Sequence, residues 1–158
     1  MSHIRTRKGL YRLIYFSSFS PGFPSAEAEQ DVEVAKIVRT AVQHNRDVGL
    51  TGLLLVYQQW FLQALEGSEE AVRATYSRIR LDPRHQNAVA LGEGSVAARV
   101  FSRWTMCARR LTPADNGILQ TLDLKATFDP HRLTPVSALR LLTIVKNIQL
   151  RNAGAAGA

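Results

Sequence analysis

Cysteine is almost absent from this chain, because Cys107 is the only one among 158 residues. A single cysteine excludes an intrachain disulfide and is typical of a reducing compartment, so we expect a cytoplasmic protein. Long apolar runs are absent as well, and none approaches the roughly 20 residues that a membrane span needs. The basic residues 1–9 precede a short apolar stretch that Arg12 interrupts and that has no small-residue cleavage site. We therefore interpret them as a tail entering a strand and not as part of a signal peptide.

Acidic residues are outnumbered, and the formal net charge is +7. Such an excess is compatible with contact to nucleic acid, an acidic protein or a membrane surface. The sequence nevertheless has no dense Lys/Arg block with interleaved aromatic residues, because its basic residues are scattered. We interpret most of them as solvated surface and expect no direct binding of nucleic acid and no membrane partner.

Strand and helix patterns alternate over the first two thirds of the chain. Apolar alternation and turn residues predict strands over 10–18, 50–58, 59–67, 87–94 and 103–110. Helical spacing predicts one helix over 31–45 with Asp31 as its N-cap, and another from Ser68, also a capping residue, to about 82. The order β-α-β-β-α-β with an added fifth strand is typical of a ferredoxin-like α+β fold. In that fold the first and third strands are neighbours, and both helices cover one sheet face.

Residues 111–150 read as a helical extension. A short helix is expected near 113–124, a break falls at FDPHRLTP, and an amphipathic helix follows over about 136–150. That last helix has more apolar surface than a lone surface helix needs, so it should pack on the free sheet face or on a partner. We expect the tail, 151–158, to be disordered. No internal repeat or linker indicates a second domain.

Gln63 is the residue that this pattern explains least. A glutamine in a central strand needs partners for two N–H donors and a carbonyl oxygen. Left unpaired and buried, it would cost roughly 1–3 kcal/mol. If the first and third strands are neighbours, Tyr15 meets Gln63 on the same face. Asn45 at the end of the first helix, and Trp104 and Met106 on the fifth strand, converge on the same region.

Each of these residues also has a purely structural explanation. The Tyr15 hydroxyl could bond to backbone, Asn45 could cap its helix, Trp104 could be core and Met106 could fill a gap. Other functions on the same fold also stay open. A small phosphatase would need a phosphate-binding glycine loop, an RNA-binding sheet would need an RNP1-like run, and a substrate-reducing flavoprotein would need a reactive cysteine or a nicotinamide motif. The alternative that we keep is a ferredoxin-like module that binds nucleic acid or phosphate without flavin.

Five motifs together decide between these readings. They are LIYFS around Tyr15, HNRDVGLTGLLLVY around Asn45, FLQALEG around Gln63, DPRH at 82–85 and FSRWTM at 101–106. In this order and spacing they resemble the BLUF family of blue-light sensors that use flavin. The resemblance runs from about Leu10 to Met106, and we place the domain at 10–110. A long loop over 18–30 and Pro83 depart from the family pattern.

The resemblance implies a noncovalently bound FAD, with FMN or riboflavin as other candidates, held between the two helices. It implies that no metal is needed. Asn45 would bond the C4 carbonyl and N3 edge of the ring, while His44 would lie near the ring or the ribityl chain. The remaining cofactor contacts that it implies come from Tyr15, Ser17, Gln63, Arg78, Asp82, Arg84 and His85.

The resemblance also implies a photochemical pair. Tyr15 would give an electron and a proton to the excited flavin, Gln63 would relay the proton, and Gln63 would then bond the ring differently and shift its absorption to the red. Such a protein is a switch and not an enzyme. Trp104 and Met106 would pass the change through the fifth strand to the C-terminal helices. The receiver would be a separate signalling protein, which the sequence does not identify, or a homo-oligomer of this chain.

Overall fold

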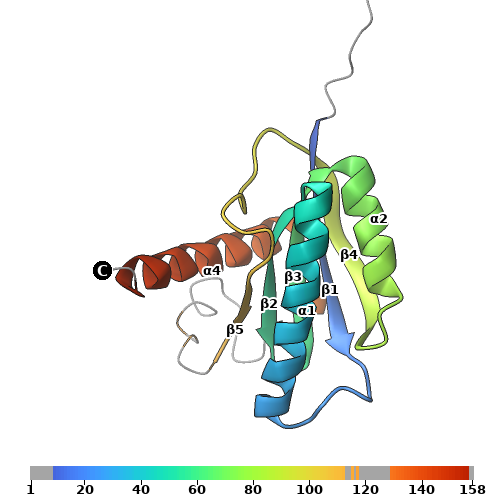
Figure 1. Ribbon diagram of the computed structural model, residues 1–158, viewed down its shortest axis with the longest axis vertical. Coiled ribbons are helices and arrows are strands. Elements are labelled where there is room, and N and C mark those ends of the chain that lie inside the picture. The colour runs from blue at the N-terminus through green and yellow to red at the C-terminus, as the bar shows by residue number, and fades with distance from the viewer. Residues whose placement is uncertain (1–8, 113–114, 116, 118–128, 157–158) are drawn as a thin grey trace, which may run out of the picture.

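A five-stranded sheet with helices on both faces forms this computed structural model, which describes residues 9–112, 115, 117 and 129–156 (Figure 1). The strands lie in the order β4-β1-β3-β2-β5. Their neighbours are antiparallel except for the parallel pair of β2 and β5. The ferredoxin-like α+β fold and the central position of the first and third strands are therefore confirmed. The elements are β1 (Leu10–Phe19), α1 (Glu27–Val48), β2 (Thr51–Tyr57), β3 (Trp60–Ser68), α2 (Glu69–Arg80), β4 (His85–Val96), β5 (Ala108–Arg110), the 3-10 helix η2 (Pro130–Arg132) and α4 (Pro135–Ala156).

The register of the two central strands places the key polar residues side by side. Tyr15 of β1 lies directly opposite Gln63 of β3, and Leu54 of β2 lies opposite Gln63 on its other side. Because side chains alternate between the two faces of a sheet, directly opposed residues share a face. The strand pairing alone therefore brings the Tyr15 phenol to the Gln63 amide.

Alternation also divides the apolar residues into two cores. On one face the sheet packs against α1 and α2, and on the other it packs against α4 (Figure 1). Ala138, Leu141, Leu142 and Val145 of α4 are fully buried against the second face. The C-terminal helix therefore covers the free face of the sheet, which was one of the two positions expected for it.

The helix ends follow local chemistry, with one departure from expectation. Ser68 caps α2 as predicted, because its hydroxyl accepts from the Ala71 N–H at 3.2 Å. Asp31 does not cap α1, which begins one turn earlier with Ala26 in the N-cap position and no side-chain cap. The acidic residues of the first turn, Glu27 and Glu29, favour this earlier start through the helix dipole. Gly49 ends α1 in the left-handed conformation with φ of 75°.

Two other boundaries differ from the sequence reading. The fifth strand pairs over only Ala108–Arg110, because residues 103–107 form a connection that meets the sheet through single backbone bonds. Helix α4 continues through the expected tail to Ala156, since alanine is the best helix former and no proline intervenes. The short helix expected near 113–124 lies outside the described residues, apart from positions 115 and 117.

Candidate functional site

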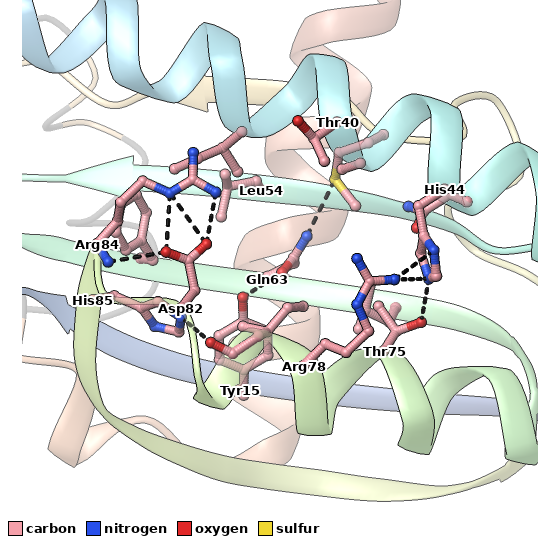
Figure 2. Close-up of a pocket in the computed structure, with 17 residues that line it drawn as sticks. Tyr15, Thr40, His44, Leu54, Gln63, Thr75, Arg78, Asp82, Arg84 and His85 are labelled. Atoms are coloured by element: carbon pink, nitrogen blue, oxygen red, sulfur yellow. Dashed lines mark hydrogen bonds and ion pairs between the residues drawn. The ribbon is translucent and has the colours of Figure 1, made fainter.

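A pocket opens between α1, α2 and the sheet face that carries Tyr15 and Gln63 (Figure 2). It encloses about 810 Å³ of space free of protein atoms, including solvent at its mouth. Its lining residues are Tyr15, Ile37, Thr40, Ala41, His44, Asn45, Leu54, Phe61, Gln63, Leu65, Thr75, Arg78, Ile79, Asp82, Arg84, His85 and Met106.

A chain of three side chains crosses the floor of this pocket. The Tyr15 hydroxyl donates to Gln63 Oε1 in a buried hydrogen bond. Gln63 Nε2 then donates to the Met106 sulfur at 3.3 Å. Burial, with smaller contributions from Tyr76 and Asp82, raises the pKa of the Tyr15 phenol far above its ordinary value. The phenol is therefore protonated at any physiological pH, and it acts as the donor in this chain.

Asn45 connects the pocket to the segment that carries Met106. The residue lies in the last turn of α1 and is 1% exposed. Its Nδ2 donates to the Thr105 carbonyl at 2.6 Å, and its backbone oxygen accepts from Gly49 and Leu50. Its Oδ1 has no partner within the part of the chain that the structure describes, so one amide acceptor remains for a ligand. Gly49, and not Asn45, ends the helix, so the simple capping role is excluded.

Asp82, Arg84 and His85 form one end of the pocket (Figure 2). Arg84 donates two hydrogen bonds to the Asp82 carboxylate, from Nη2 to Oδ2 at 2.6 Å and from Nε to Oδ1 at 3.0 Å. Burial would raise the pKa of Asp82, but the hydrogen bonds from Arg84 outweigh it and lower that pKa. The result is an anion and a cation that neutralise each other and stay ionised together.

His85 is held beside this pair by the backbone. Its Nε2 bonds the carbonyl of Ile79 at the end of α2. Burial lowers the pKa of His85, so the ring is neutral at pH 7. Its Nδ1 is buried and has no hydrogen-bond partner among the described residues, although the ring lines the pocket. A neutral ring that donates through Nε2 offers an acceptor at Nδ1.

His44, Thr75 and Arg78 form the other end (Figure 2). Arg78 Nη1 donates to His44 Nδ1 at 2.7 Å, and His44 Nε2 contacts the Thr75 hydroxyl at 3.0 Å. Burial and the Arg78 charge both lower the pKa of His44, as an acceptor role for Nδ1 requires. Arg78 makes no ion pair with an acidic side chain among the described residues, so it presents an uncompensated positive charge at the pocket mouth.

Most of the residues that the resemblance singled out meet in this pocket, but two do not. Ser17 is fully buried with its hydroxyl unpartnered among the described residues, yet it does not line the pocket. Trp104 lies in the connection before β5, where its carbonyl accepts from Gly52 at 3.2 Å, and Met106 occupies the place beside Gln63. Thr75 was missed, although its helical spacing of three residues from Arg78 indicated a shared face.

The lining residues fit a flat, polar-edged ring such as that of a flavin. The apolar side chains of α1 that face the sheet remain half-buried, as expected of a helix standing over a cavity. Polar atoms of Gln63, Asn45 and His85 surround the same space. Apolar walls with a few convergent polar groups are typical of cofactor sites.

Comparison with known proteins decides the family. Residues 10–107 match the family described as sensors of blue-light using FAD, BLUF. This chain belongs to the BLUF family. FAD is therefore the cofactor of its sensor domain, and the recognition made from the five motifs is confirmed.

Solved BLUF proteins share the fold over most of this chain. BlsA in its photo-activated state superposes with a TM-score of 0.73 at 25% identity, covering 84% of this chain and 91% of BlsA. The dark-state structure of BlrB, a BLUF protein, gives a TM-score of 0.63 at 26% identity, covering 87% of this chain and 97% of BlrB.

BLUF sequences also occur within much larger relatives. The photoactivated adenylate cyclase subunit beta of Euglena longa is 30% identical over 97 residues, or 61% of this chain. The alpha subunit of Euglena gracilis is 32% identical over 98 residues. This chain spans only 11% and 9% of those two relatives. Among the residues that the structure describes, no helix is long and apolar enough to cross a membrane.

Proposed function

We propose that this BLUF domain senses blue light through the pair Tyr15 and Gln63 and returns to its dark state without turning over a substrate. The observation that carries the proposal is the continuous chain from the Tyr15 hydroxyl through the Gln63 amide to the Met106 sulfur, at the floor of the pocket between α1, α2 and the sheet. When bound, FAD supplies the blue-light absorption and, once excited, a strong oxidant for a nearby phenol.

Tyr15 is arranged to release its proton only when it is oxidised. Its raised pKa keeps the proton on the hydroxyl in the dark, and Gln63 Oε1 is the atom that receives the hydrogen bond. A phenol that loses an electron becomes a strong acid, so the proton then moves toward Gln63. The electron would then return from the flavin to Tyr15 together with a proton, and Gln63 would be left rotated or tautomerised, with its N–H group redirected away from Met106.

The other lining residues hold the cofactor in this proposal. Asn45 binds the carbonyl edge of the ring, while the neutral His44 and His85 and the Asp82–Arg84 pair surround the remaining polar groups. Ser17 supports the strand beside Tyr15 from outside the pocket. Arg78 is the uncompensated cation, which favours the flavin phosphates or a ring oxygen.

The output passes from Met106 through β5 to α4 and on to a partner protein or a second copy of this chain. We assign residues 10–110 to the sensor and 111–150 to the helical cap. Relatives whose names include an adenylate cyclase show that BLUF sequences occur beside effectors, and the receiver here is of that general kind or is recruited in trans.

The deciding experiment is an absorption spectrum of the purified chain, reconstituted with FAD, in darkness and after blue light. A flavin band that shifts slightly to the red and recovers in darkness supports the proposal. A chain that binds FAD but shows no reversible shift would sink it, and one that binds no flavin would restore the nucleic-acid or phosphate-binding alternative.

A further inference from the structure

The segment that follows Trp104 is attached to both helical layers by alternating side chains. Met106 and Ala108 pack in the core under α1 and α2, whereas Cys107 and Leu111 pack in the core under α4. The alternation of an extended chain continues through the two arginines of β5. Arg109 Nη1 donates to Gln149 of α4 at 3.1 Å, and Arg110 points to α1 on the opposite side.

Arg110 binds the first turns of α1 through several polar contacts. Its guanidinium reaches Asp31 Oδ1 at 2.9 Å, Gln30 Oε1 at 3.1 Å and Glu27 Oε1 at 3.7 Å. The Arg110 side chain is only 16% exposed, so these contacts are partly shielded from solvent. Because the guanidinium is planar and has three acceptors, these contacts fix both the orientation of the Arg110 side chain and its distance from α1.

The same helix holds the other end of the segment, because Asn45 donates to the Thr105 carbonyl at 2.6 Å. Asp31 and Asn45 lie in one continuous helix, 14 positions apart or about 21 Å along its axis. The five residue-to-residue steps from Thr105 to Arg110 span about 16 Å in an extended chain, and the long Arg110 side chain makes up the difference. The segment therefore runs antiparallel to α1 and is attached near both ends of it, with Met106 between the two attachments.

We propose that Arg110 is a positioning residue for Met106, acting from the far end of α1. Two attachments to one rigid helix leave the segment little freedom to slide along α1. A displacement of Met106 is therefore passed across the strand to Cys107 and Arg109, and through Gln149 to α4. The light-dependent part of this inference rests on the proposed function, whereas the placement of the segment does not. Arg110 does not line the pocket, so its substitution removes no direct contact to the cofactor.

The first test uses the sole cysteine as a native probe on the opposite side of the strand. Burial raises the pKa of the Cys107 thiol, which makes it slow to react in the intact dark protein. In Arg110→Gln we expect an aromatic disulfide reagent to modify Cys107 at least about threefold faster, a change of the size that partly shielded ion pairs support. The matched control is Arg73→Gln, which removes a contact to Glu69 within α2 and a contact to Glu93 of β4. Equal modification rates in the two variants would overturn the proposal.

The second test measures the photocycle of the FAD-loaded full chain. Arg110→Gln should keep the amplitude of the red shift but change the dark recovery rate at least about twofold, as expected for loss of a partly exposed ion pair. Asp31→Asn removes the same ion pair from its exposed side and should change the dark recovery rate in the same direction. Arg110→Lys keeps the positive charge, so its recovery rate should lie between those of the wild type and Arg110→Gln. Recovery unchanged in both Arg110→Gln and Asp31→Asn would contradict the inference. A wild-type chain with no red shift would instead contradict the proposed function, and the thiol test would still decide the role of Arg110.

Discussion

At the scale of single residues, the Tyr15 ring has two aromatic neighbours within the protein. Tyr76 lies 5.2 Å from it and His85 lies 6.5 Å from it, measured between ring centroids. The strand register places Tyr15 opposite Gln63, and its hydroxyl donates to Gln63 Oε1. Aromatic neighbours at such distances add packing energy beyond the area that they bury.

Replacing Tyr15 by phenylalanine tests the donor role with little change in packing. We expect Tyr15→Phe to bind FAD but to lose the reversible red shift, because no phenol proton is available. Gln63 loses a buried partner, so the free energy of unfolding should fall by roughly 1–3 kcal/mol. Difference spectra and denaturant titration measure the two effects. Tyr76→Phe is the matched control, and a normal photocycle in Tyr15→Phe would refute the assignment.

His85 and His44 predict how stability depends on pH. Both have a lowered pKa in the folded chain, chiefly because of burial. The unfolded chain therefore takes up protons first as the pH falls below about 6.5, and the free energy of unfolding should decrease from there. His85→Gln should flatten this decrease. Chemical unfolding at several pH values between 5 and 8 measures it, and a wild-type stability that stays constant over this range would contradict the prediction.

At the scale of elements, the connection from β4 to β5 is attached to the sheet by a buried carboxylate. Glu66 is completely buried on β3 and accepts from Arg12 Nε at 2.8 Å, Val100 N at 2.9 Å and Phe101 N at 2.6 Å. Arg99 strengthens the attachment of this connection, because its guanidinium donates hydrogen bonds to the backbone carbonyls of Glu66 and Gly49. The start of the segment that leads to Met106 therefore has a fixed position on the sheet.

Removing this carboxylate should destabilise the fold more than removing a surface ion pair. Glu66→Ala leaves the Arg12 charge and two backbone N–H groups without their acceptor, and we expect a loss of about 3–5 kcal/mol. Denaturant unfolding measures the change. The control Glu69→Ala breaks an exposed pair with Arg73 and should cost less than about 1 kcal/mol. Similar losses in both variants would show that the buried contacts contribute little.

The elements that could be predicted from the sequence are those set by local patterns. Strand alternation and the helical spacing of apolar residues gave the order of β1 to β4, and that order gave the contact between Tyr15 and Gln63. The predicted start of α1 is wrong, because Asp31 was used as the cap and the acidic first turn with Glu27 and Glu29 was given no weight. The length of β5 could not be predicted, because it depends on long-range contacts, such as those of Arg110 with α1, which carry no local signature. The choice of Met106 over Trp104 beside Gln63 is also tertiary, because both residues have the same strand parity.

At the scale of the whole molecule, the pocket side and the α4 side of the sheet differ in how completely they are filled. The α4 side is closed by fully buried residues such as Leu141 and Leu142, whereas Val34, Ile37 and Val38 of α1 remain half-buried. A ligand that fills the pocket covers this apolar surface in the folded state only. Binding is therefore coupled to stability.

Added FAD should raise the thermal midpoint of unfolding. At free FAD of about 100 times Kd, the gain should approach about 2.7 kcal/mol if the unfolded chain does not bind it. Differential scanning calorimetry with increasing FAD measures the shift, with adenosine monophosphate as the control for nonspecific nucleotide binding. An unchanged midpoint, or an equal shift with the control, would contradict a pocket specific for the flavin ring.

The half-buried face of α1 contributes Ile37 and Ala41 to the lining of the pocket. The pocket walls and the hydrogen bond between Tyr15 and Gln63 are built from the chain's own residues. These residues absorb no blue light themselves, so FAD is the one part of the sensor that the chain must take up. Chains without flavin do not respond to blue light. The fraction of molecules that respond therefore follows the supply of flavin in the cell.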